Sequence, residues 1–168
     1  MKTRHGLWLG LAIFALAAVP IRAADVEEQM QKYFEQVTSG KDEAAAKKLG
    51  DSILTGLDKD ANQLNEFAWK ILTEDGIKNR DLDLAMRVAK AAYDACEGKS
   101  AAIVDTYARA LFDTGKVADA IKFQKKALEL CDDDNLRTEL EDTLKRYEKK
   151  ASEEKKPAEE KKATEEKK

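Results

Sequence analysis

The chain has 168 residues, 38% of them charged, and its 33 acidic residues outnumber its 30 Lys and Arg residues. This balance argues against general nucleic-acid binding, which needs a net basic surface. The only histidine, His5, lies in an N-terminal segment that we expect to be removed. A mature chain without histidine cannot use a histidine base, a Ser-His-Asp or Cys-His nucleophile, or a histidine-ligated metal.

The N-terminus has the pattern of a secretory signal peptide. Lys2 and Arg4 precede an apolar run over residues 6–19, and a small residue, Ala23, marks the expected cleavage point. The run is shorter than the roughly 18–20 residues that span a bilayer, although an uncleaved membrane anchor is the alternative. No cysteine lies near the cleavage point, so there is no lipobox. We expect a signal peptide over residues 1–23 and a periplasmic or secreted mature chain with no stable membrane insertion and 27 Lys and Arg against 33 Asp and Glu.

Residues 24–60 predict a helical hairpin. Two stretches carry apolar side chains at the spacing of one helix face, and Gly40 separates them. The hairpin is either a degenerate repeat or a cap for the helices that come after it in the chain. Its two stripes are Val26, Met30, Phe34 and Val37, then Ala45, Leu49, Ile53, Leu54 and Leu57.

Residues 61–134 contain two similar helix-turn-helix units. The first helices share an apolar pattern offset by 40 residues, whereas the second helices are offset by 35, so the first unit has a turn five residues longer, within residues 74–82. Asp81 is a predicted N-cap, and Gly115 can take the left-handed conformation that ends a helix. The matching first-helix positions are Leu64, Phe67, Ala68 and Ile71, then Val104, Tyr107, Ala108 and Leu111.

Small residues recur at the eighth, twentieth and twenty-seventh places of these units, which resembles the tetratricopeptide repeat family. They are Ala68, Ala85 and Ala92 in the first unit, then Ala108, Ala120 and Ala127 in the second, with Gly115 in its turn. The chain departs from the family at Gln124, where an aromatic is usual, and at Asp132, where a proline is usual. The resemblance implies an all-α, right-handed solenoid of antiparallel helix hairpins, and we expect about seven helices.

The same region is also similar to the repeats that follow the redoxin domain in some exported bacterial thioredoxin-like proteins. This sequence has neither a redoxin domain nor a Cys-x-x-Cys motif. The similarity therefore implies the helical module and its export, and does not imply redox activity.

The family resemblance also implies a binding groove lined by the first helices. Carried over by position, its residues are Asn62, Asn65, Trp69, Leu72 and Thr73, then Ala102, Asp105, Arg109, Phe112 and Asp113. Trp69 and Phe112 would be flat apolar anchors, and Arg109 a bidentate partner for a carboxylate. The alternative is that Trp69 packs against the N-terminal hairpin and Arg109 pairs with Asp105.

Cys96 and Cys131 occupy equivalent places, 35 residues apart, at the ends of the second helices. Export favours a disulfide, but packed helices lie about 8–10 Å apart and disulfide Cα atoms within about 7 Å. We expect structural cysteines, with a disulfide as the alternative. The acidic runs fit no calcium loop and no phosphate-binding loop occurs, so we expect no catalytic residues, metal or cofactor.

Residues 135–150 predict a capping helix, and residues 151–168 a disordered tail of alternating Glu and Lys pairs. The sequence as a whole predicts a non-enzymatic interaction module that holds a segment of another exported or envelope protein. The alternatives are a non-catalytic accessory protein of an exported redox system and an envelope-associated spacer. The sequence does not predict the oligomeric state.

Overall fold

The computed structural model describes residues 23–165, with side chains placed for residues 25–154. This part of the chain consists of seven α-helices and has no strand, which confirms the predicted all-α class. The predicted signal peptide lies outside the described residues except for Ala23, where the first helix begins. The helices are α1 (Ala23–Ser39), α2 (Glu43–Gly56), α3 (Ala61–Thr73), α4 (Leu82–Ala95), α5 (Ala101–Asp113), α6 (Val117–Leu130) and α7 (Asp134–Glu165).

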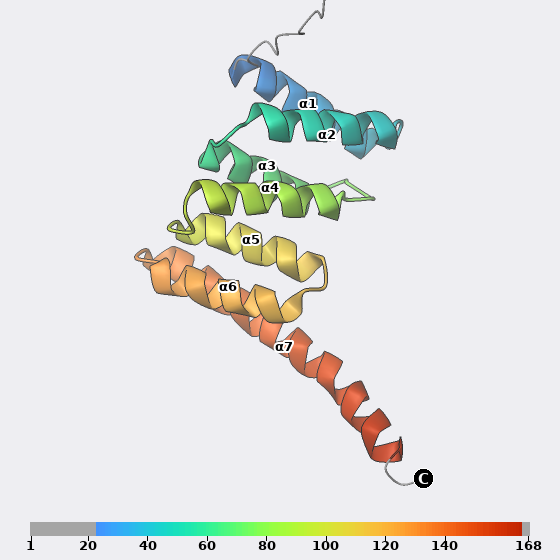
Figure 1. Ribbon diagram of the computed structural model, residues 1–168, viewed down its shortest axis with the longest axis vertical. Coiled ribbons are helices and arrows are strands. Elements are labelled where there is room, and N and C mark those ends of the chain that lie inside the picture. The colour runs from blue at the N-terminus through green and yellow to red at the C-terminus, as the bar shows by residue number, and fades with distance from the viewer. Residues whose placement is uncertain (1–22, 166–168) are drawn as a thin grey trace, which may run out of the picture.

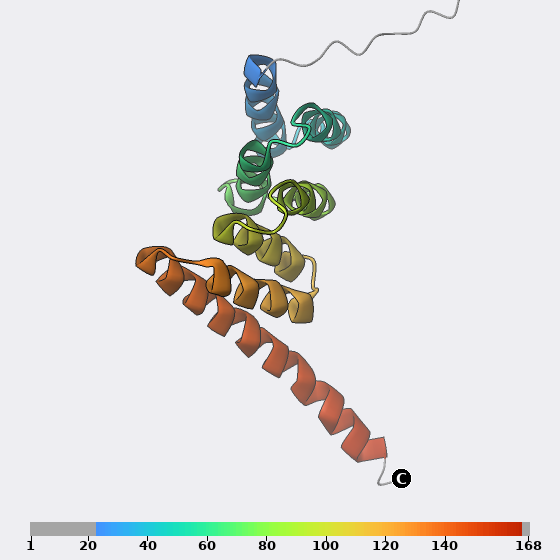
Figure 2. The same ribbon diagram turned by 60° about the vertical axis from the view of Figure 1, so that its left-hand side comes forward.

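The helices form antiparallel hairpins stacked along one axis (Figure 1). The most extensive packing is between α5 and α6 and between α3 and α4, followed by α6 with α7 and α1 with α2, and α4 packs on α5 to join the hairpins. Figure 2 shows α1 and α3 in one layer, with α2 and α4 in a second layer beside it. The first helices of the hairpins therefore form one face of the stack, and we call α1, α3 and α5 the first-helix face.

Polar caps and a left-handed glycine set the helix ends where the sequence predicts them. The carboxylate of Asp81 accepts a hydrogen bond from the Leu84 backbone N–H at 2.8 Å, which satisfies a donor that the first turn of α4 leaves unpaired. Asp133 does the same for Leu136 at the start of α7. Gly115 has a φ of +79°, a conformation open to glycine at little steric cost.

The connection between α3 and α4 covers residues 74–81, against residues 114–116 between α5 and α6, which is the predicted five-residue difference. Two residues, Arg80 and Ile77, order this longer segment. Arg80 donates hydrogen bonds to the backbone carbonyls of Ile71 at 2.8 Å and Glu74 at 2.6 Å, and Ile77 is buried. The guanidinium thus caps the end of α3, whose last carbonyls lack helical partners.

The core depends on small residues between the helices and aromatic groups at their junctions. All six alanines of the repeat pattern are fully buried, and their lack of bulk permits close helix packing. The aromatic groups pack mostly edge to face, an arrangement favoured by the charge distribution of the rings. They are Tyr33, Phe34 and Phe67 at the first junction, then Tyr93, Tyr107 and Phe123 at the next.

The last helix is longer than the predicted capping helix over residues 135–150. It continues to Glu165, so residues 151–165 are helical where the sequence analysis expected a disordered tail. Glu and Lys residues three and four apart can pair along a helix, as Lys150 and Glu154 do at 3.4 Å. The apolar stripe ends at the buried Tyr147, and beyond it α7 projects away from the stack (Figure 1).

Candidate functional site

The predicted groove residues on α3 have different environments. Trp69 is 42% exposed, and among the described residues it is one of two large hydrophobic side chains that are exposed to solvent. Asn62 is exposed and Asn65 half-buried. Leu72 is only 2% exposed and belongs to the core, so it is not available as a groove contact. The tryptophan therefore stands out on this helix as the apolar side chain that the fold leaves uncovered.

The predicted groove residues on α5 lie against the chain's own last helix. The ring of Phe112 stacks on Tyr147 of α7, with centroids 4.2 Å apart and planes inclined by 17°. Tyr147 is fully buried. Arg109 pairs with Asp113, one turn later, at 2.8 Å, where the sequence analysis considered Asp105 as its partner. On this half of the first-helix face, α7 therefore covers Phe112, while Ala102 stays exposed.

A buried polar link attaches α7 to the second unit. The Nε2 of Gln124 donates to the carboxylate of Asp105 at 2.8 Å and to the backbone carbonyl of Leu140 at 3.2 Å. Burial raises the pKa of the Asp105 carboxyl, and the hydrogen bond from Gln124 partly opposes that rise. Gln124 is the place where the sequence departs from the family's aromatic, so this departure has a structural use here.

An open cleft lies between α1 and α3, at the other half of the same face. Its volume is about 530 Å³, within the range of small binding sites. Two half-buried apolar side chains, Met30 and Phe34, form its apolar surface. Phe34 packs against Phe67 of α3, with ring centroids 6.0 Å apart. The other lining residues are Glu27, Gln31, Gln63, Glu66, Lys70 and Glu74.

A comparison of equivalent positions in the two units shows why the cleft is open on this side of α3. In the second unit, the positions that match Gln63, Glu66 and Lys70 at the 40-residue offset are Ile103, Thr106 and Ala110. All three are buried, at 4%, 2% and 0% exposure. Charged side chains cannot be buried in this way without a large desolvation cost. These three positions lie beside, not on, the groove positions that the tetratricopeptide resemblance implies, so the resemblance did not predict them. The comparison of the two units at the 40-residue offset does reveal them.

A second cleft, of about 540 Å³, lies between the α1–α2 and α3–α4 connections. Its basic residues are Lys47, Lys78 and Arg80. Arg80 is already bonded to backbone carbonyls, and Asn79 donates to Glu43 across the cleft at 3.1 Å. These contacts join the two connections to each other.

Neither Cys96 nor Cys131 is paired in a disulfide. Cys131 is buried and Cys96 half-buried, and each Sγ lies 3.3 Å from a backbone carbonyl oxygen. Among the described residues, no group of His, Cys, Asp and Glu has the arrangement of a metal site. Within the same range, every helix is too short or too polar to cross a bilayer.

Comparisons with protein-family models, with characterised proteins and with solved structures find no match to this chain.

Proposed function

We propose that this chain is a tetratricopeptide-like interaction module, exported from the cell, that holds a segment of another exported or envelope protein against its first-helix face. Binding would be non-covalent, through burial of a few side chains on a preformed surface. The proposal would make the chain a scaffold rather than an enzyme.

The observation that carries the proposal is the pairing of an exposed tryptophan with an open cleft on one helix. Trp69 is 42% exposed, and α3 also supplies one wall of the 530 Å³ cleft. Tryptophan is enriched among the residues that dominate binding energy, because its ring buries a large area at low entropic cost. A partner segment that crosses α3 would reach both features.

A matched pair of substitutions tests the proposal. Trp69→Ala removes the exposed ring from the first-helix face, whereas Leu130→Ala removes the other exposed large side chain, 37% exposed at the end of α6. Cross-linked capture from an envelope extract, with circular dichroism to confirm helicity, should lose its specific partner with Trp69→Ala and keep it with Leu130→Ala. Equal capture by both variants would contradict the proposal.

A further inference from the structure

We propose that the cleft between α1 and α3 selects a basic peptide segment that carries an apolar side chain. This inference rests on the proposed function and specifies the chemistry of the partner. It follows from the apolar surface of the cleft, the charges on its two walls and the packing that keeps it open.

The apolar surface of the cleft fits one inserted side chain. Met30 and Phe34 are half-buried in the cleft. The Phe34 ring is held in place by two edge-to-face contacts. Its ring centroid lies 5.2 Å from that of Tyr33 and 6.0 Å from that of Phe67. Burial of an aliphatic side chain here would remove apolar area on both partners from water, which favours binding. The methionine can adapt to the shape of the inserted group.

The charges around this apolar surface are mainly negative. The carboxylates are Glu27 on α1, Glu66 on α3 and Glu74 at the end of α3. Lys70 is the one basic lining residue, and it pairs with Glu66 at 3.0 Å. Among the described residues, neither Glu27 nor Glu74 is part of an ion pair. The cleft therefore presents two carboxylates that are outside any ion pair, one on each wall, beside an apolar surface.

This arrangement favours lysine or arginine side chains on either side of an apolar residue. Complementary charges at the rim increase the association rate and disfavour acidic partners, while the apolar contact contributes to affinity. An acidic segment would place like charges against both walls.

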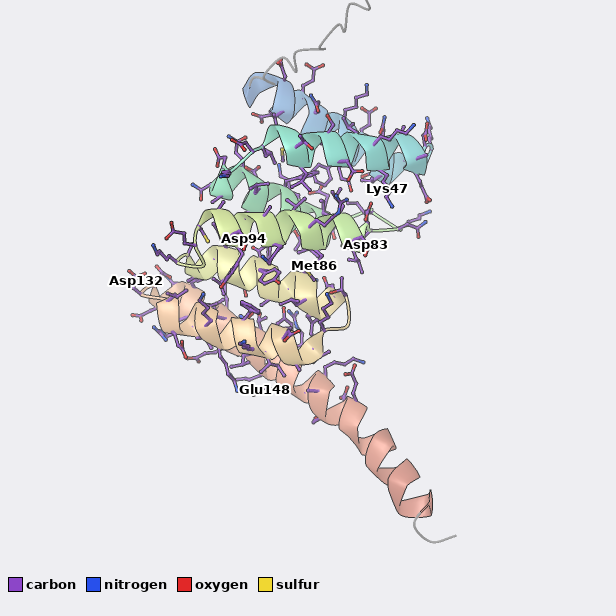
Figure 3. All side chains as sticks on the ribbon, viewed as in Figure 1. Lys47, Asp83, Met86, Asp94, Asp132 and Glu148 are labelled. Carbon is purple, nitrogen blue, oxygen red and sulfur yellow. The ribbon has the colours of Figure 1, made fainter. Side chains whose placement is uncertain are left out.

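The test is a titration of the full chain by fluorescence anisotropy with three short fluorescein-labelled peptides. The first has lysines around a central leucine, the second has serine in place of that leucine, and the third has glutamates around the leucine. The test variant is Glu27→Lys with Glu74→Lys. The control is Glu129→Lys with Asp132→Lys, which makes the same charge change at exposed positions near the α6–α7 turn, where Figure 3 labels Asp132.

We expect the lysine–leucine peptide to bind the unmodified chain most tightly. The cleft variant should weaken this binding by about tenfold or more, since two attractive contacts become repulsive, while the control should change it by no more than about twofold. The serine peptide should bind more weakly than the leucine peptide. The milder Glu27→Gln with Glu74→Gln variant should give an intermediate loss.

Three results would overturn the inference: equal losses in the cleft and control variants, no loss in the cleft variant, or preferred binding of the glutamate peptide. If the glutamate peptide bound most tightly and Trp69→Ala abolished that binding, the proposed function would stand and only the basic character of the partner would be refuted. Lysine–leucine binding at the cleft, together with capture that does not depend on Trp69, would instead place the failure in the proposed function.

Discussion

The stacked pair of Phe112 and Tyr147 gives the most quantitative prediction. Tyr147 is fully buried, and its hydroxyl has no hydrogen-bond partner of ordinary geometry among the described residues. Truncation of a buried aromatic side chain to alanine costs about 3–5 kcal/mol. Tyr147→Ala should therefore lower the free energy of unfolding by about 3–5 kcal/mol and the melting temperature by on the order of 10 °C.

Tyr147→Phe is the matched control for this prediction. It keeps the ring and removes only this buried hydroxyl, which lacks a hydrogen bond of ordinary geometry, so it should leave the free energy of unfolding unchanged or raise it by up to about 1 kcal/mol. Urea unfolding followed by circular dichroism gives both values, and hydrogen exchange should show faster exchange in α7 only for Tyr147→Ala. Equal stability of the two variants, or a cost below about 1 kcal/mol for Tyr147→Ala, would contradict the packing of the Tyr147 ring on α5.

Three further predictions rest on burial and geometry. The folded state raises the pKa of the Asp105 carboxyl, so ionisation of this group costs stability as pH rises through its folded pKa. Asp105→Asn should therefore be more stable than the parent chain at pH 7, and the difference should shrink as pH falls toward about 4. Thermal melts across this range would contradict the prediction if the difference grew as pH fell. Gly50→Ala should destabilise by about 1–3 kcal/mol, because its Cβ would lie 2.4 Å from a methyl carbon of Leu84, and an unchanged urea midpoint would refute this. Under non-reducing conditions both thiols should react with a thiol reagent after denaturation, and in the native state Cys131 should react much more slowly than Cys96. Loss of the mass of two hydrogen atoms from the intact chain would instead reveal a disulfide.

Local signals in the sequence were sufficient to predict the helices and their pairing. Apolar residues at helical spacing placed all seven helices, and the carboxylate of Asp81 marked the start of α4. The difference between the two repeat offsets located the longer connection between α3 and α4. These features depend on residues close together in the chain, which is why they can be read without a structure.

The candidate site depends on contacts that no local pattern encodes. The stacking of Phe112 on Tyr147 joins residues 35 positions apart, and it removes Phe112 from the predicted groove. Likewise, Gln124 reads as a departure from a family pattern until the structure places it between Asp105 and Leu140. The cleft could be predicted from the sequence only by comparing equivalent positions in the two units, because Glu66 on its own resembles an ordinary surface residue.

The central claim is that partners bind the first-helix face at α1 and α3. Site-specific photo-cross-linking tests it most directly, with a benzophenone amino acid placed in turn at Gln63, Trp69 and Leu130 of the full chain. Gln63 lines the cleft, while Leu130 is exposed on α6. The account predicts cross-links from positions 63 and 69 to one segment of the same partner and none from position 130. Cross-links from position 130 alone would contradict it.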